Sequence, residues 1–265
     1  MAPLPADLHN HSCLSPCGSL DLSPRALAET AAARGTAVLA LTDHNASRNC
    51  PAFSFHCRRL GIIPFYGLEC TTQEEVHMVC LFASLDAALA FGDLIYSIIM
   101  PFPNDPEKTG DQVYVDEEDH IQGELEYFLP GAADIGVDAL GPRAAEYGGI
   151  VIPAHVDRPA FSMASQLGVV VRGPWAAVEC TRIPPVIFPP PLMGSPGDPP
   201  PEPRKLDTLG YPLITGSDAH YLEHVARRSF ELDSTREELL PRGPGGDADM
   251  EALKRALEKR PGDPR

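Results

Sequence analysis

Several features that would have narrowed the function class are missing from this sequence of 265 residues. No apolar run approaches the roughly 18 residues needed to cross a membrane, and the first residues lack a charged and then apolar signal region. We therefore expect a cytoplasmic protein with no membrane partner. The sequence also contains no phosphate-binding P-loop, no dinucleotide-binding glycine fingerprint and no Gly-x-Ser-x-Gly nucleophile motif.

Basic residues are scarce. The chain has 21 Lys and Arg against 37 Asp and Glu, which gives a formal charge of −16. This balance disfavours binding of long nucleic acid along an extended basic face. It leaves room for a small anionic substrate in a locally positive pocket.

Cysteine spacing offers no disulfide framework, because the seven cysteines are odd in number and scattered. Cys57, Cys70, Cys80 and Cys180 have apolar neighbours and are predicted to be buried reduced thiols. Cys13 and Cys17 differ, because they lie in a polar loop beside histidines.

Short apolar runs alternate with helical patterns along the chain, as in a mostly parallel α/β fold. Seven strands in a chain of this length favour a barrel, so we predict one distorted (β/α)7 barrel domain over residues 1–265. The expected helices are 25–34, 85–99 and 137–147, and the main expected strands are 37–41, 62–68, 75–82, 150–154, 175–178 and 211–215.

Two segments interrupt this alternation and are interpreted as loop insertions in the same domain. Residues 101–136 are acidic and turn-rich, and a hairpin within them could act as a lid. Residues 184–204 contain ten prolines, too many for regular structure. Residues 249–260 are predicted to form an amphipathic closing helix.

Residues able to bind a metal or move a proton recur at the ends of the predicted strands. In α/β barrels the carboxyl ends of the strands meet on one face, so such residues come together from distant positions. Imidazole and carboxylate groups bind zinc, manganese or iron, and a carboxylate can bridge two ions. The strand-end residues are His9, His11, His44, Glu69, His155, Glu179, Asp218 and His220.

The motifs that contain these residues resemble, in order, those of the PHP family (polymerase and histidinol phosphatase domain). They are Asp7-Leu8-His9-Asn10-His11-Ser12, Leu41-Thr42-Asp43-His44-Asn45, Gly67-Leu68-Glu69, Glu75-Val76-His77, Pro153-Ala154-His155-Val156-Asp157-Arg158 and Gly216-Ser217-Asp218-Ala219-His220. The resemblance implies a distorted (β/α)7 barrel that carries a phosphoesterase site with two or three divalent ions (Zn, Mn or Fe).

The resemblance also implies a distribution of ligands. One ion would be held by His9, His11, Glu69 and Asp218, and Glu69 would bridge to a second ion on His77 and His155. His44 and His220 would belong to a third site. Where family members often have a histidine or aspartate in that site, this chain has Pro16 and Cys17. Cys17 is therefore the candidate for the missing ligand, and a thiolate there would favour zinc or iron.

The mechanism that the resemblance implies is attack on phosphorus by a hydroxide that bridges two ions. Glu69 and Asp218 would take part through the ions. Arg158 and Arg48 follow strand ends and could clamp a phosphate, and the alternative for each is an ordinary surface ion pair. Asp7 and Asp43 could orient histidines or have a structural role, and Glu179 could support a ligand without binding the ion itself.

Two other function classes compete with a phosphoesterase. The segment His220-Tyr221-Leu222-Glu223-His224 matches the inverted zinc-peptidase motif, which requires both histidines on one helix. A non-catalytic barrel with a structural metal could instead serve as a regulatory module. The favoured substrate is a small phosphate ester: a phosphomonoester or a cyclic phosphodiester, with a nucleotide among the options.

Overall fold

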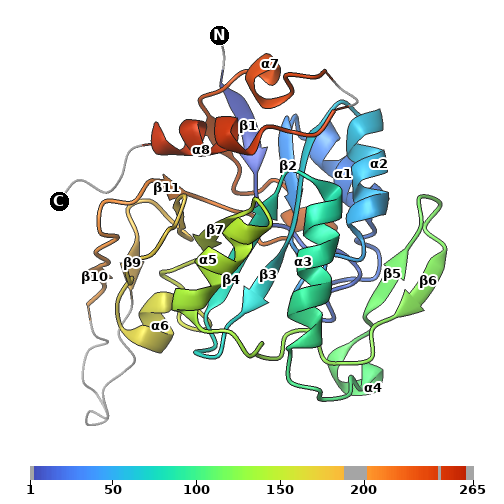
Figure 1. The fold of residues 1–265 in the computed structure, drawn as a ribbon, viewed down its shortest axis with the longest axis horizontal. Helices are drawn as coiled ribbons and strands as arrows, with labels where there is room; N and C mark the ends of the chain where they lie inside the picture. Colours follow the sequence, from blue (N-terminus) through green and yellow to red (C-terminus); the bar gives the residue numbers. More distant parts are fainter. Residues whose placement is uncertain (1–2, 188–201, 244–245, 261–265) are drawn as a thin grey trace.

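A computed structural model describes residues 3–187, 202–243 and 246–260 (Figure 1). Its central element is a curled six-stranded sheet in the order β12-β1-β2-β3-β4-β7. The strands of this sheet are β1 (Leu4–Asp7), β2 (Val38–Leu41), β3 (Ile63–Thr71), β4 (His77–Phe82), β7 (Ile150–Pro153) and β12 (Phe230–Leu232). The fold is therefore α/β, as the alternating pattern predicted.

Strand directions in the sheet are mixed. β1, β2 and β3 run parallel, whereas β4 pairs antiparallel with both β3 and β7. A separate parallel pair consists of β8 (Val178–Glu179) and β11 (Leu213–Ile214). Isolated bridges join the segments next to this pair to the region of the sheet, Trp175 before β8 with Val151 of β7, and Ala219 after β11 with Asn10 after β1.

The prediction of a distorted (β/α)7 barrel is confirmed in its α/β class and its curled sheet, and a full barrel is not shown by the described residues. Because β8 and β11 have only two residues each, their ladders do not continue into the six-stranded sheet. The described residues thus form a curled sheet, with a short strand pair beside it, rather than a closed barrel of seven regular strands.

Helices lie on both sides of the sheet near the predicted positions. Helix α1 begins after Ser23, whose hydroxyl accepts a hydrogen bond from the Ala26 amide, with Pro24 at the first position. The long helices are α1 (Pro24–Ala33), α2 (Cys50–Arg59), α3 (Leu85–Ser97), α5 (Val137–Glu146) and α8 (Met250–Glu258). The shorter ones are α4 (Pro106–Thr109), α6 (Met163–Leu167), η1 (Leu222–His224) and α7 (Arg236–Leu239). No helix in these described ranges is both long enough and apolar enough to span a bilayer.

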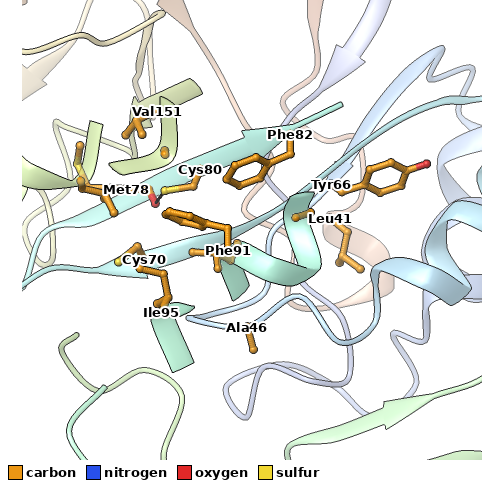
Figure 2. Packing of buried hydrophobic residues seen from close by; sticks show 14 of the residues in the cluster. Leu41, Ala46, Tyr66, Cys70, Met78, Cys80, Phe82, Phe91, Ile95 and Val151 are labelled. Atoms are coloured by element: carbon orange, nitrogen blue, oxygen red, sulfur yellow. Dashed lines mark hydrogen bonds between the residues drawn. The ribbon is translucent and has the colours of Figure 1, made fainter. Parts of the chain in front are cut away.

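The core is divided between the two faces of the sheet. Leu39 and Leu41 of β2 pack into the cluster on one face, and Val38 and Ala40 into the cluster on the other. The first cluster includes the aromatic pair Phe82 and Phe91, with ring centroids 5.0 Å apart (Figure 2). Burial on both faces explains why β2 is a continuous apolar run and does not alternate with polar residues.

The insertion at 101–136 contains the expected hairpin, β5 (Val113–Val115) and β6 (Ile121–Glu124). Its turn is attached to the helices beside it, because Arg25 of α1 and His56 of α2 both bond the Glu117 carbonyl. A role as a lid stays a prediction. The proline-rich segment lies mostly outside the described residues, and its flanks form the ribbon of β9 (Val186–Ile187) and β10 (Arg204–Lys205).

Candidate metal centre

The predicted ligand residues come together at one edge of the sheet. His9 and His11 follow β1, His155 follows β7, and Asp218 follows β11. His77 reaches the same edge because β4 is antiparallel and His77 is its first residue. A strand that runs in reverse thus contributes its amino end where its neighbours contribute their carboxyl ends.

Glu69, in β3, is the centre of this group. Nitrogen atoms of five histidines lie 3.0–3.3 Å from its carboxylate oxygens. The side chain is 1% exposed, and water therefore cannot solvate its charge. The five histidines are His9, His11, His44, His77 and His155.

The side chains form three overlapping sets with a spacing suitable for cations. In each set one possible ligand atom from every residue lies within 4.8 Å of the others. The sets are His9–His11–Glu69–Asp218, His44–Glu69–His77 and His11–His44–His220. The first set contains the residues that the family resemblance implied for one ion. His155 lies beside the second set, with Nε2 at 3.1 Å from Glu69 Oε1.

The absence of hydrogen-bond partners for several of these atoms supports a cation centre more strongly than their proximity does. A buried polar group normally has a hydrogen-bond partner, because an unpaired one costs free energy. Here several buried ligand atoms lack a partner among the described residues, namely His9 Nε2, His11 Nε2, His44 Nδ1, His77 Nδ1, Glu69 Oε2 and Asp218 Oδ1. All of them belong to the three sets, so the residues present are suited to holding divalent ions.

The charges of the centre shift its pKa values in opposite directions. Burial raises the pKa of Glu69, but the facing charges of His77 and His9 outweigh it and bring that pKa well below its usual range. Burial lowers the pKa of His11, yet the facing carboxylates of Asp218 and Glu69 raise it to about 9. Burial and the His11 charge lower the pKa of His220 to about 4.

A second layer of side chains orients the ligands. The Glu179 carboxylate lies 2.9 Å from His9 Nδ1, so it fixes the ring and directs Nε2 toward Glu69. Ser15 Oγ lies 2.9 Å from His11 Nδ1 and donates to Asp43 at 2.7 Å. Sequence reasoning anticipated supporting roles for Glu179 and Asp43 but missed Ser15, for which only its proximity to the His11 motif was a signal.

Backbone strain also concentrates at this edge. His155 and Asp218 adopt positive φ angles of 31° and 47°, values that L-residues with side chains rarely adopt. Strain of this kind persists only where the surrounding structure enforces it, and it is common at functional sites. Asp7 contributes here, because its carboxylate accepts a hydrogen bond from the Ser217 amide directly before Asp218.

The remaining predicted site residues differ in their positions. Arg158 Nη1 lies 2.7 Å from Asp218 Oδ2 and is adjacent to the centre. Arg48 instead pairs with Asp93 of α3 at 2.7 Å, the surface ion pair that was its alternative interpretation. Cys17 is exposed and belongs to none of the three sets, and its role as a ligand stays a prediction.

The inverted peptidase motif does not have the geometry that it needs. Tyr221 is extended, with φ −142° and ψ 153°, and only Leu222–His224 form a short 3₁₀ turn. His220 and His224 therefore do not share a helix face, whereas His220 takes part in a histidine set with His11 and His44. This arrangement argues against the peptidase.

Comparison with known proteins agrees with this geometry. Residues 7–125 match the model of the PHP domain. This part of the chain belongs to the PHP domain family. The matched segment includes His9, His11, His44, Glu69 and His77, while His155 and Asp218 follow it. No curated protein matches the chain in sequence.

Solved structures with the PHP-like fold extend the likeness to nearly the whole chain. The lesion-specific endonuclease Q of Pyrococcus furiosus is 15% identical with a TM-score of 0.55, covering 96% of this chain and 56% of the endonuclease chain. A Bifidobacterium adolescentis protein, provisionally described as a metal-dependent phosphoesterase, is 16% identical with a TM-score of 0.50, covering 97% of both chains. This chain thus spans little more than half of the endonuclease, and both likenesses concern the fold.

Proposed function

We propose that this protein is a metal-dependent phosphoesterase that hydrolyses a small phosphate ester, either a phosphomonoester or a cyclic phosphodiester. The observation that carries the proposal is the Glu69 carboxylate, buried among five histidines whose facing nitrogens include several without a hydrogen-bond partner. Membership of residues 7–125 in the PHP domain family supports the same reaction class.

The three sets define which residues would hold ions. His9, His11, Glu69 and Asp218 would hold one ion, and Glu69 with His77 and His155 would hold a second, with Glu69 shared. His44 and His220 would belong to a third, with Cys17 as a further candidate ligand, because His11 Nδ1 faces Ser15 and its Nε2 serves the first ion. Zinc, manganese and iron all suit these nitrogen and oxygen donors. Divalent ions bound there would activate water and neutralise charge on phosphoryl oxygens.

The protein itself supplies orientation and charge around the reacting group. Glu179 and Ser15 hold the rings of His9 and His11 in place, so the ligand geometry is set before substrate arrives. Arg158 lies at the border of the centre with a side chain 41% exposed, and it can exchange Asp218 for a phosphate oxygen. Burial of the ligands excludes bulk water from most of the centre.

The competing substrate class is DNA, because the structurally similar endonuclease Q acts on duplex DNA with an abasic lesion at its active site. The net charge of −16 opposes binding of a long polyanion. The chain also spans only 56% of that endonuclease. A small ester needs neither an extended basic surface nor the additional length.

The test is phosphate release from a panel of phosphomonoesters and cyclic phosphodiesters, with an abasic DNA duplex as a further arm. We expect release from small esters with zinc, manganese or iron, and loss of release after complete removal of metal by a chelator. Arg158→Gln should lower kcat/KM by about tenfold or more while metal content stays unchanged. Metal binding without release from any substrate would favour the regulatory module, and cleavage of the duplex alone would favour a nuclease.

A further inference from the structure

Phe161 combines a strained backbone with an exposed aromatic side chain beside the metal centre. Its φ angle is 54°, in the left-handed region that bulky residues rarely adopt. The residue is 40% exposed, so burial of the ring offsets only part of the free-energy cost of this conformation. The contacts that hold Phe161 in place are therefore informative about its role.

Hydrogen bonds close the loop on both sides of Phe161. The loop leads from the predicted ligand His155 to α6, and the Arg158 amide donates to the His155 carbonyl at 2.9 Å. The Ser162 hydroxyl donates to the Arg158 carbonyl at 2.7 Å and accepts from the Ser165 amide at 3.0 Å, which caps α6. Phe161 lies between these anchored residues, so the loop backbone fixes where its ring is placed.

The ring of Phe161 covers His77, another of the predicted ligands. The two rings are nearly parallel, with centroids 4.8 Å apart and an interplanar angle of 15°. This separation is within the range of favourable aromatic pairs. The backbone joins the same two residues, because the His77 amide donates to the Phe161 carbonyl at 2.9 Å. Phe161 thus contacts a ligand through both its main chain and its side chain.

His77 lacks the kind of support that His9 receives. The Glu179 carboxylate lies 2.9 Å from His9 Nδ1 and orients that ring. His77 uses its Nδ1 to face Glu69, at 3.0 Å, and no residue in the described part of the chain forms a hydrogen bond with its Nε2. On the side away from Glu69, the ring is therefore held by stacking and not by a hydrogen bond.

Two further rings contact His77, but both belong to the centre itself. His44 and His155 lie with their centroids 5.1 Å and 5.5 Å away, each at an interplanar angle of 62°. Their own orientation is part of the ligand geometry, so they are not independent supports. The parallel ring of Phe161 resists rotation of His77 about its Cβ–Cγ bond, a torsion with broad preferences, because a tilt drives the imidazole edge into the phenyl face.

The stacking contact is expected to be stronger when an ion is bound. A cation on Nδ1 withdraws electron density from the imidazole of His77, and a more positive ring is attracted to the face of a phenyl group. A contact that strengthens on ligation adds to metal affinity, whereas a contact of equal strength in both states does not.

We propose that Phe161 is a positioning residue of the metal centre, which holds His77 with Nδ1 toward Glu69 and so strengthens binding of the ion that these two ligands share with His155. This inference rests on the proposed metal-dependent function, because it concerns one of the ions of that centre. The strain at Phe161 then has a function, since it places the ring over the ligand.

The first test is zinc affinity, measured by titration with a competing chelator, in three variants of Phe161. Phe161→Ala and Phe161→Leu remove the flat ring, and the leucine keeps an apolar side chain in case alanine disturbs the loop. Each should weaken the binding of one zinc ion by about two- to tenfold, which corresponds to the loss of one aromatic pair. Phe161→Tyr keeps the stacking and should have the affinity of the unmodified protein.

A spectroscopic readout reports the orientation of His77 independently of activity. A phenyl ring shields protons that lie over its face, so the imidazole protons of His77 should resonate upfield in the unmodified protein. In protein with isotope-labelled histidine, these signals should move downfield in Phe161→Ala and stay in place in Phe161→Tyr. The metal-free spectrum tests the contact itself, and the zinc titration tests its effect on the ion.

Phe55→Ala is the matched control. Phe55 of α2 is another exposed phenylalanine, at 47%, and its ring also contacts a histidine, His56, with centroids 5.1 Å apart. His56 belongs to none of the three ligand sets, and its Nε2 lies 2.9 Å from the Glu117 carbonyl. Zinc affinity and phosphate release should stay unchanged in this variant.

The outcomes separate this inference from the proposed function. Unchanged zinc affinity in both Phe161→Ala and Phe161→Leu overturns the positioning role, and so does an equal loss in Phe161→Tyr. A higher KM for esters with an aromatic group, without a change in zinc affinity, also overturns it and assigns the ring to substrate contact. The expected zinc and spectroscopic results without phosphate release from any ester support the positioning role and defeat the phosphoesterase proposal.

Discussion

Within the part of the chain that the structure describes, two regions contain ligand-type residues at metal-binding spacing, and they differ in burial and in hydrogen bonding. The group around Glu69 is buried and contains several unpaired ligand atoms. Asp116, Glu118 and His120 on the β5–β6 hairpin also lie within ligand distance of one another, but the Glu118 and His120 side chains are exposed. Asp116 already accepts bonds from the amides of Glu118 and His120. Residue type and spacing are therefore insufficient, and burial without a partner is what distinguishes a cation centre.

The largest expected effect tests that distinction directly. Glu69→Gln removes the charge that five histidines face, so we expect bound metal to fall by at least one ion per chain and phosphate release to fall by more than about a hundredfold. This loss exceeds the roughly 10–100-fold decrease in metal affinity or activity that is typical when a residue that only supports a ligand is replaced. Metal analysis after equilibrium dialysis, together with the ester assay, measures both.

The matched control is the hairpin variant Glu118→Gln/His120→Ala. It removes two of the three ligand-type side chains there, and metal content and activity should stay unchanged. A loss of metal from this variant comparable to that from Glu69→Gln would reverse the contrast between the two regions.

A smaller effect on metal affinity is expected for Glu179, which contacts the ligand His9 and belongs to none of the three sets. Glu179→Gln keeps the size of the side chain but weakens its hold on His9 Nδ1, now 2.9 Å from the carboxylate. Metal affinity should fall by about 10–100-fold while the fold is kept. Titration with a competing chelator gives the affinity, and circular dichroism reports the fold. An unchanged affinity would mean that His9 is oriented by packing alone.

A site residue could be predicted from the sequence when it lies at the end of a strand. Residues at strand ends, such as His9, His155 and Asp218, were predicted because apolar runs are easy to see and parallel strands align their ends. The antiparallel direction of β4 was not predicted, since a strand pattern carries no direction. His77 was placed in the centre by its motif, and only the structure shows why it reaches that edge.

Long-range geometry was the part that sequence reasoning could not supply. A full seven-stranded barrel is not shown by the described residues, because two-residue strands such as β8 and β11 end before a regular ladder forms, and apolar runs overestimate strand length. No motif or strand end predicts the position of Arg227, which depends on a turn at Ala226 that returns the chain to Ser217.

Metal affinity of the buried centre should depend on pH, because protonated ligands must release their protons when ions bind. In the metal-free protein the pKa of His11 is raised to about 9, so its ring carries a proton at neutral pH that competes with a cation. Affinity for a divalent ion should rise between pH 6 and pH 9, by up to about tenfold per unit for each proton displaced. Calorimetry in buffers of different ionisation enthalpy measures the protons released. A pH-independent affinity would contradict this competition.

The smallest expected effect concerns Cys17, which lies at the border between the buried centre and the surface. Although Cys17 is exposed as a residue, desolvation of its thiol and the charge of Glu69 raise the pKa of that thiol to about 12, so alkylation by iodoacetamide at pH 7.5 should be slow in the metal-free protein. If Cys17 ligates zinc, zinc loading slows its alkylation further, by severalfold. If it does not, the added positive charge lowers its pKa and speeds the reaction.

Mass spectrometry of the labelled protein separates these two results, and protection is the one we expect. Cys13 serves as the internal reference, because it is buried beside Asn49 and the Val113 carbonyl and its pKa is also about 12. Its labelling should be slow with and without zinc. Faster labelling of Cys17 with zinc would remove the thiol from the ligand set and leave His44 and His220, among the described residues, as the proposed protein ligands of a third ion.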